Sequence, residues 1–583
     1  MHSKSSRDEQ ASLNAHLNLV LSICGKFSNG IAAFIVGSAL FGMVLLSSGM
    51  DYAFKTEFLL PNWTLFFLAP LVLLLFHKVA IGKMGVSISK VISQYPKLID
   101  TLTAIACAGL LILQVLICQR YAFVTDWDSG GITNNALTIA SSGNFTNADY
   151  YSTYPNNLFL LWIAVQCGNI AQLLGAASSL EIVLIFSILN CIACALSLWF
   201  LYRTLSLMYS RIYGLIAWVL GIMLIWTSPW AGILYSDAIV VCVPIILSYL
   251  FVRFRKSPGL KRFVWLFLLG FIGILGYKIK PQVVFVLFAV VALLLMELIF
   301  SIGKTIREKE ARISVTPTIQ LFVVAAGCAA ALILVNHLIA PWTSLLNPNK
   351  EIGISHFLMM GLNPDARGVY SQPDVDFSAS FPDVSSRTIG NLQVILERVS
   401  HYGLFGLLAL LCDKLMTNFN DGTFAWGVEG HFFVYPQTEP VGGLTGFVHS
   451  IYYREGAYYD LWRTYAQFIW IAVLICCFVG LLAGATHRAK RKDKAQRNLS
   501  SDFSLVVSLA ILMLIVFELL FEARARYLYS SVTLFIVMAV IGIRWLTQRA
   551  RAMKTHKAHG AKPHFRKAGM MHRPESASAK RPN

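Results

Sequence analysis

The sequence predicts an all-α polytopic membrane protein with about twelve transmembrane helices. Of its 583 residues, 56% are hydrophobic and only 13% are charged, which is about half the charged share of an average soluble domain. Apolar runs of roughly 17–25 residues recur along the chain, and this is the length that a helix needs to cross a bilayer. The basic residues gather in short segments between these runs, as they do in proteins that span a membrane.

The predicted spans follow one another from the N-terminal region to residue 546. They lie near 31–49, 63–77, 99–119, 181–202, 212–228, 237–252, 263–277, 281–301, 319–341, 464–484, 503–521 and 527–546. A further apolar segment, 158–175, is predicted to lie as a helix on the outer surface. If that segment crossed the bilayer, the basic loops would fall on both sides of the membrane. If it does not cross, all of them fall on the cytoplasmic side.

The net charge of +18 therefore indicates membrane orientation and not nucleic-acid binding, because the positive residues cluster beside the spans and in the tail. Both termini are predicted to be cytoplasmic in a multi-pass protein of the cell membrane. The expected parts of the chain are a cytoplasmic N-terminus (1–30), a transmembrane catalytic module with a first outer loop at 120–180 (31–341), an extracytoplasmic segment (342–463), C-terminal transmembrane helices (464–546) and a basic, disordered cytoplasmic tail (547–583).

The first outer loop carries the candidate catalytic residues, Asp126 and Asp128, on either side of Trp127. Carboxylates at the mouth of a membrane bundle are costly unless they bind or catalyse something. One of them could take a proton from an acceptor hydroxyl, and its neighbour could hold a divalent cation or orient a sugar. An isolated pair of acids could equally be a solvated loop. The sequence leaves open both the choice of base and the need for a metal.

The same loop supplies candidate substrate-binding residues in a Tyr-Pro-Asn-Asn turn, namely Tyr154, Asn156 and Asn157. Aromatic rings and paired amides at a headgroup boundary suit carbohydrate. An interfacial aromatic belt would explain the tyrosine but not the two asparagines. Asp237, at the outer end of another span, is predicted either to line the same cavity or to cap its helix.

Basic residues on the outer side form the candidate phosphate site, because the positive-inside tendency disfavours them there. They are Lys278, Lys280, Arg524 and Arg526. Arginine forks grip phosphate with two hydrogen bonds. For the lysines the alternative is snorkelling to lipid headgroups. For the arginines it is a pair between Glu522 and Arg526 at i, i+4, and Glu522 is otherwise a substrate-binding candidate.

The long segment 342–463 offers weaker candidates. His356 could assist acid–base chemistry, but a lone histidine is more often structural. Phe424 and Trp426 could stack on a sugar ring or anchor at the interface.

Taken together, these motifs resemble those of the C-type membrane glycosyltransferases, which include protein O-mannosyltransferases and the aminoarabinose transferases of lipid A. The shared features are an acidic motif after an early span, a surface helix introduced by a proline turn, about twelve spans and an arginine-rich turn before the last span. The closest likeness is to Gram-positive bacterial members of that group. It covers the first half and the last two spans best, and 342–463 more loosely.

The resemblance implies a sugar donor linked to a polyprenyl phosphate and transfer, with inversion, to a hydroxyl of a glycan, lipid or protein acceptor outside the cytoplasm. The first-loop acid would be Asp126 or Asp128, and the lipid phosphate would be held by Lys278, Lys280, Arg524 and Arg526. Some members use a divalent cation and others do not. The rival prediction is a flippase or transporter of a lipid-linked sugar or other cell-envelope precursor. Transporters, however, tend to place ionisable groups at mid-membrane and to show internal repeats.

Overall fold

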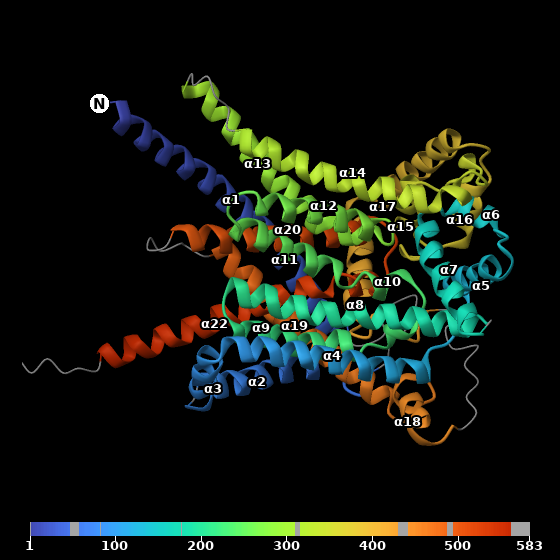
Figure 1. Ribbon diagram of the computed structural model, residues 1–583, viewed down its shortest axis with the longest axis horizontal. Coiled ribbons are helices and arrows are strands. Elements are labelled where there is room, and N and C mark those ends of the chain that lie inside the picture. The colour runs from blue at the N-terminus through green and yellow to red at the C-terminus, as the bar shows by residue number, and fades with distance from the viewer. Residues whose placement is uncertain are drawn as a thin grey trace, which may run out of the picture.

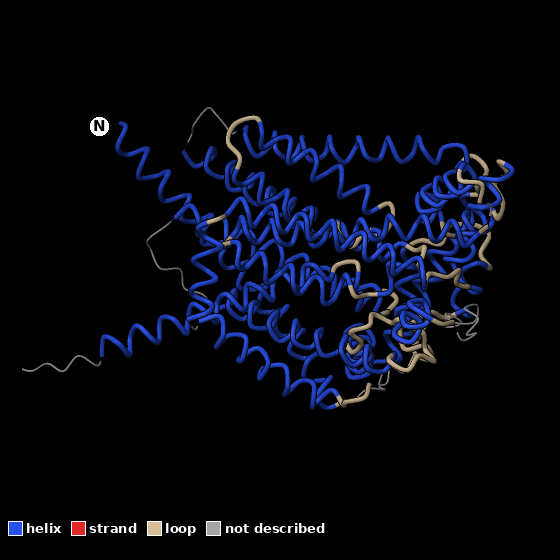
Figure 2. The backbone as a smooth tube through the Cα atoms, turned by 60° about the horizontal axis from the view of Figure 1, so that its bottom comes forward, coloured by secondary structure: helices blue, strands red, loops and turns tan. Residues whose placement is uncertain are grey.

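The computed structural model describes residues 2–46, 58–81, 83–176, 178–308, 315–429, 441–486 and 494–560. Within these residues all regular elements are helices, and none is a strand (Figures 1 and 2). The elements are α1 (His2–Leu45), α2 (Asn62–Ile81), α3 (Lys83–Gln94), α4 (Pro96–Tyr121), α5 (Trp127–Ser142), α6 (Ala148–Thr153), η1 (Pro155–Asn157), α7 (Leu158–Leu173), α8 (Ser179–Met208), α9 (Arg211–Gly221), η2 (Ile222–Trp226), η3 (Pro229–Gly232), α10 (Ser236–Ile239), α11 (Val243–Lys256), α12 (Lys261–Tyr277), η4 (Pro281–Val284), α13 (Phe285–Glu308), α14 (Val315–Thr343), η5 (Pro348–Lys350), α15 (Ile354–Gly361), α16 (Gln372–Ala379), α17 (Val384–Phe419), α18 (Gly443–Tyr452), α19 (Tyr459–Thr486), α20 (Lys494–Leu520), α21 (Ala525–Tyr529) and α22 (Val532–Gly560).

Ten helical segments in the described part are long and apolar enough to cross a membrane, which confirms the predicted class. Nine of them coincide with predicted spans: Leu19–Leu45, Pro96–Tyr121, Ser179–Met208, Ser236–Lys256, Pro281–Gly303, Thr316–Thr343, Tyr459–Thr486, Leu499–Leu520 and Val532–Met553. Two further predicted spans are shorter apolar helices, Asn62–Leu71 and Arg211–Trp226, and another is the 17-residue α12. The count of twelve spans is therefore not confirmed.

The tenth segment, Val384–Phe419, was not predicted as a helix of this length and lies inside the region 342–463. Its backbone breaks at Gly403, where φ is 55° and ψ is −172°, so α17 is two helices joined at an angle. A positive φ of this kind is accessible to glycine at little cost. The region 342–463 is thus folded where it is described, with α15 to α18 inside it.

Neighbouring helices approach closely where glycines face each other. In α19, a Cβ at Gly480 would lie 2.2 Å from the Met538 carbonyl oxygen, and in α22 a Cβ at Gly542 would lie 2.1 Å from the Cys476 carbonyl oxygen. These two glycines let the backbones of α19 and α22 touch, as small residues do in membrane helix pairs.

Two ion-pair clusters tie helices together at the end of the bundle opposite α5. Asp100 of α4 pairs with Arg203 of α8 and Arg211 of α9, at 3.2 and 2.9 Å. Arg255 of α11 pairs with Glu297 of α13, which joins two further helices there. The N-terminal part of α1 and the last turns of α22 project from this same end (left in Figure 1).

At the other end, α5, α6, α7, α15 and α16 form a cap on the bundle (right in Figure 1). A second hydrophobic core lies here and includes Ile132, Tyr151, Leu161 and Val335. The predicted surface helix is α7, which packs against α5, α8 and α14. Gly143 ends α5 with a φ of 72°, a backbone conformation that glycine adopts at little cost.

The tail differs in part from its prediction. α22 continues to Gly560, so residues 547–560 are helical and not disordered. Residues 561–583 lie outside the described part of the chain.

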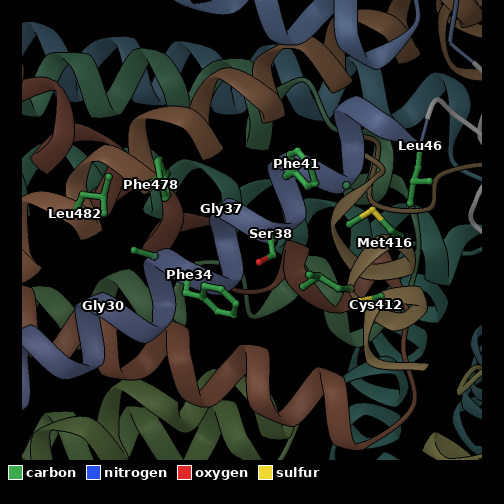
Figure 3. Close-up of a pocket in the computed structure, with 13 residues that line it drawn as sticks. Gly30, Phe34, Gly37, Ser38, Phe41, Leu46, Cys412, Met416, Phe478 and Leu482 are labelled. Atoms are coloured by element: carbon green, nitrogen blue, oxygen red, sulfur yellow. The ribbon is translucent and has the colours of Figure 1, made fainter. Parts of the chain in front are cut away.

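A groove of about 770 Å³ opens between α1, α17 and α19 (Figure 3). Its walls are almost entirely apolar or small residues, among them Gly37, Phe41, Met416 and Phe478. The groove contains none of the predicted site residues, which gather elsewhere in the bundle.

Candidate functional site

The predicted catalytic motif forms the first turn of α5. Asp126 stands at the N-cap with an exposed side chain, and Asp128 lies within the first turn. A Cβ at Gly130 would come within 2.2 Å of the Thr125 carbonyl oxygen, so only glycine fits this tight entry into the helix. The turn separates the two acids, with Asp126 toward solvent and Asp128 toward the bundle.

Asp128 is held by tyrosines from two other segments. The Tyr235 hydroxyl donates a hydrogen bond to Asp128 Oδ2 at 3.0 Å. Burial first, and then the negative charge of Asp128, raise the pKa of Tyr150 and of Tyr235 above the usual tyrosine range. Both phenols are therefore neutral donors at physiological pH. Asp128 is the acid that the fold places in a defined environment.

Trp127 connects the first outer loop to the last one. Its φ of 45° is strained for a residue with a bulky side chain, and such strain persists only where the surroundings fix it. The indole packs edge-on against Tyr235, with ring centroids 4.6 Å apart. The guanidinium of Arg526, from α21, lies 4.6 Å from the centroid of the same indole. The segment that follows α4 and the segment that precedes α22 therefore meet in one site.

Arg526 is a buried cation with incomplete partners. It is 7% exposed, and its guanidinium lies over the rings of Trp127, Tyr235 and Tyr527 at 4.6, 5.0 and 5.5 Å. Its Nε lies 3.7 Å from Glu429 Oε1, too far for a hydrogen bond. Within the described residues, Nε and Nη1 of Arg526 and Nε1 of Trp127 have no hydrogen-bond partner. Such buried donors are costly unless a ligand or water accepts from them.

Arg524 is paired differently. Its Nη1 donates to Glu429 Oε2 at 2.7 Å, and its Nε donates to Glu522 Oε1 at 3.1 Å. Glu522 also accepts from the Tyr527 hydroxyl at 3.0 Å. The alternative pair between Glu522 and Arg526 is therefore not the one that forms. Of the two predicted arginines, Arg524 is neutralised by carboxylates and Arg526 is the one with free donors.

Lys280 and Asp237 form a buried ion pair between η4 and α10. Lys280 is 4% exposed and Asp237 is 1% exposed, and Lys280 Nζ lies 4.5 Å from the centroid of the Tyr527 ring. Asp237 does not cap its helix, since Tyr235 is the N-cap residue. Lys280 and Arg526 therefore both lie against the ring of Tyr527. Lys278 lies at the C-cap of α12.

The predicted Tyr-Pro-Asn-Asn turn borders the same site. Asn157 is buried and donates to the Tyr150 hydroxyl at 2.7 Å, whereas Asn156 is exposed. Burial, then Tyr370, Asp128 and Glu522, raise the pKa of Tyr154. The Tyr154 ring packs against that of Tyr150, with ring centroids 5.3 Å apart, so Tyr154 borders the surroundings of Asp128. Of the predicted substrate residues, Tyr154 and Asn157 belong to the site, and Asn156 lies at its edge.

Three residues of the site were not predicted, namely Tyr235, Glu429 and Tyr527. Tyr527 directly follows Arg526, and Tyr235 lies two residues before Asp237, so their positions could have been inferred. Glu429 is 6% exposed and lies in the loop after α17, eight residues beyond Asp421. Its only signal in the sequence was an acid in an otherwise apolar and aromatic context.

The weaker candidates have structural surroundings. His356 is 1% exposed, and its Nδ1 lies 2.8 Å from Ser378 Oγ, which donates to Asn391. Burial lowers the pKa of His356 to about 4. Trp426 packs among Tyr121, Phe123 and Trp230, so it anchors a loop and does not face a ligand.

A divalent cation would have Asp126 and Asp128 as its first available ligands. In the described residues no group of three or more His, Cys, Asp or Glu side chains could hold a metal ion. Asp128 Oδ2 is already engaged by Tyr235.

These features define the class: a polytopic helical membrane protein with a buried, charge-paired site at one end of its bundle. Residues 27–545 match a family model described as conserved hypothetical integral membrane protein, and the chain belongs to this family. No match was found among curated proteins.

Two solved proteins are similar in structure. ArnT from Cupriavidus metallidurans, bound to undecaprenyl phosphate, matches with a TM-score of 0.29 and 11% identity, over 71% of this chain and 77% of that one. The archaeal oligosaccharyltransferase AglB from Archaeoglobus fulgidus, in complex with an inhibitory peptide and a dolichol-phosphate, matches with a TM-score of 0.32 and 13% identity. That match covers 78% of this chain and 52% of AglB, about half its length.

Proposed function

We propose that the chain is a membrane glycosyltransferase that moves a sugar from a polyprenyl-phosphate donor to an acceptor hydroxyl. One observation carries the proposal. The guanidinium of Arg526, with unpartnered donors, lies 4.6 Å from the indole of Trp127, and Trp127 is the residue before Asp128. A group able to accept a proton and a group able to hold a phosphate thus face one site, as glycosyl transfer from a phosphate requires.

Asp128 is the proposed base. The acceptor hydroxyl oxygen attacks the anomeric carbon, and its proton passes to the Asp128 carboxylate. The bond between the anomeric carbon and the phosphate oxygen breaks, and its electron pair leaves with the phosphate. Tyr235 orients the carboxylate through the hydrogen bond of 3.0 Å, and Tyr150 and Tyr154 remain neutral hydroxyl donors beside it.

Arg526 is the proposed group that binds the phosphate. Attack at the anomeric carbon increases the negative charge on the departing phosphate, and a fixed buried cation stabilises that charge without reorganisation. The Trp127 indole N–H is a second donor at the same place. Lys280 and Arg524 already have carboxylate partners, so they contribute through their charge more than through free donors.

The proposed site faces the extracytoplasmic side. Arg203, Arg211, Arg255 and the projecting ends of α1 and α22 lie at the opposite end of the bundle. Basic residues of this kind mark the cytoplasmic end by the positive-inside tendency. The donor lipid and the acceptor would then meet at the outer leaflet.

The test is a transfer assay with purified protein, a radiolabelled polyprenyl-phosphate sugar and membrane extract. Asp128→Asn is expected to lower transfer at least about 100-fold, the usual contribution of a positioned base. Asp126→Asn is expected to stay within about tenfold of the parent, because the Asp126 side chain is exposed.

Asp149→Asn is the matched control, since Asp149 lies in the same loop and pairs only at the surface with Lys350. It is expected to transfer label as the parent does. Absence of transfer by the parent, or equal transfer by the Asp128 variant, would rule the proposal out. Uptake of the labelled lipid without transfer would instead indicate a flippase.

A further inference from the structure

Glu429 is a buried carboxylate placed between the two arginines of the site. It is 6% exposed, and no motif in the sequence marked it. One oxygen, Oε2, accepts from Arg524 at 2.7 Å, and the other, Oε1, lies 3.7 Å from Nε of Arg526. A carboxylate and a phosphate accept from guanidinium groups in similar ways. Glu429 therefore occupies a position that suits part of an anionic ligand.

The loop that carries Glu429 is fixed by unusual backbone geometry. Phe424 and Ala425 have φ values of 56° and 65°, in the left-handed region that such residues rarely adopt. Asp421 holds this turn by accepting from the backbone amides of Thr423 and Ala425 at 2.8 and 2.9 Å. Strained backbone of this kind persists when the surroundings over-determine it, and it clusters at functional sites. The position of the Glu429 carboxylate is thus set by the fold of this loop.

The pairing of Glu429 is nevertheless unequal. Its bond to Arg524 is short, whereas its second oxygen and the facing Nε of Arg526 are both buried without a hydrogen bond in the described residues. A half-satisfied buried pair is unfavourable. A phosphate oxygen near Nη1 of Arg526 would satisfy that cation but would also feel the negative charge of Glu429.

We infer that Glu429 is an internal competitor of the ligand phosphate and sets the affinity of the Arg526 site. This inference rests on the proposed function. With Glu429 charged, Arg526 holds the lipid phosphate loosely enough for the product, a polyprenyl phosphate, to leave. With the charge removed, Arg526 has the phosphate as its anionic partner, while Arg524 keeps its bond to Glu522. The product then binds more tightly and leaves more slowly.

The experiment measures binding of farnesyl phosphate, a short polyprenyl phosphate, to the full chain in phosphatidylcholine nanodiscs. Glu429→Gln is expected to lower the Kd by about tenfold, because a like charge next to the phosphate has been removed. In the transfer assay the same variant is expected to lower kcat and KM together. If Glu429 only supported the arginines structurally, its removal would raise the Kd instead. An unchanged or raised Kd would overturn the inference.

Further variants separate charge from folding. Glu429→Ala removes the same charge and carries the test if the glutamine variant does not fold, while Glu429→Asp keeps the charge and is expected to bind within about twofold of the parent. Glu455→Gln removes an exposed acid and is the matched control. Neutral farnesol should bind equally to all variants. If the parent itself does not bind farnesyl phosphate, the proposed donor site fails as well. If the parent binds and the glutamine variant does not bind more tightly, only this inference fails.

Discussion

Arg524 and Arg526 show how two neighbouring arginines in one turn can have different tasks. Arg524 has two carboxylate partners at 2.7 and 3.1 Å, whereas Arg526 has aromatic rings around it and donors without partners. A cation that is already neutralised contributes to stability. A cation with open donors is available for a ligand.

Substitutions should separate these two tasks. Arg526→Gln is expected to weaken farnesyl phosphate binding about tenfold or more, with little loss of stability, because its one ion pair among the described residues is the loose contact to Glu429. Arg524→Gln is expected to destabilise the protein by about 3–5 kcal/mol, because Glu429 and Glu522 would be left buried without their partner. Binding titrations and thermal unfolding of both variants distinguish the effects. Equal loss of binding with no loss of stability in both would contradict the assignment.

Much of the site could be predicted from single residues. A carboxylate at the mouth of a bundle is costly, which marks Asp128, and basic residues are disfavoured on the predicted outer side, which marks Lys280 and Arg526. The structure brings their segments together. The pairing itself could not be predicted. Glu429 joins the arginines only through the tertiary fold, since residues 424–427 form a turn whose strain depends on distant partners such as Trp230. The roles of all these residues remain predictions.

At the scale of helices, the sequence predicted best where apolar length alone decides. The spans at 99–119 and 319–341 are found nearly as expected, as Pro96–Tyr121 and Thr316–Thr343. The sequence did not predict α17, because buried charged residues such as Arg387 and Lys414 interrupt the apolar pattern of this helix. Lys414 donates to the carbonyl oxygens of Gly361 and Phe521, so its charge is satisfied by backbone that is not adjacent in sequence. A hydropathy profile does not detect a charge that is paired with distant backbone carbonyl groups.

The contact between α19 and α22 gives a prediction for this scale. Gly480→Val is expected to destabilise the protein by about 1–3 kcal/mol, because its new side chain would overlap the Met538 carbonyl. Gly109→Ala in α4 is the control, since a Cβ there meets nothing within 4 Å and alanine favours the helix. Thermal unfolding in detergent measures both. A Gly480 variant as stable as the parent would show that the helices can separate at no cost.

The buried histidine of α15 predicts a pH dependence for the elements around it. The pKa of His356 is lowered to about 4 by burial, from about 6.5 in an unfolded chain. The contribution of the neutral ring to stability is therefore full above pH 6.5 and is lost as the pH falls toward 4, by up to roughly 3 kcal/mol. Unfolding of the parent should become easier across this window. In His356→Gln, which cannot take up the proton, most of this slope should be absent.

For the whole molecule, the central feature is the separation of two ends. The site and the cap formed by α5, α6, α7, α15 and α16 lie at one end, and the basic pairs and the projecting ends of α1 and α22 lie at the other (Figure 1). The polytopic class followed from composition. The orientation depends on the basic loops, and it remains a prediction.

Cysteine labelling from outside intact cells tests the orientation. Asn144→Cys, between α5 and α6, is expected to react with an impermeant maleimide, and Leu260→Cys, between α11 and α12, only after permeabilisation. Both positions are exposed, and Leu260 is 82% exposed. The background should carry Cys412→Ser, because that native thiol is exposed. The reverse labelling pattern would show that the protein has the opposite orientation in the membrane, with the site on the cytoplasmic side.

The buried pair of Asp237 and Lys280 has a consequence for sequence variation within the family. Asp237 is 1% exposed and Lys280 is 4% exposed, so either charge without the other would be buried and unpaired. Such an unpaired buried charge strongly lowers the stability of a protein. Homologues should therefore keep both charged residues, replace both by apolar residues, or carry the acid and the base at exchanged positions. Replacement of only one of the two should be rare. The two positions would then be inherited as a unit, although 43 residues separate them along the chain.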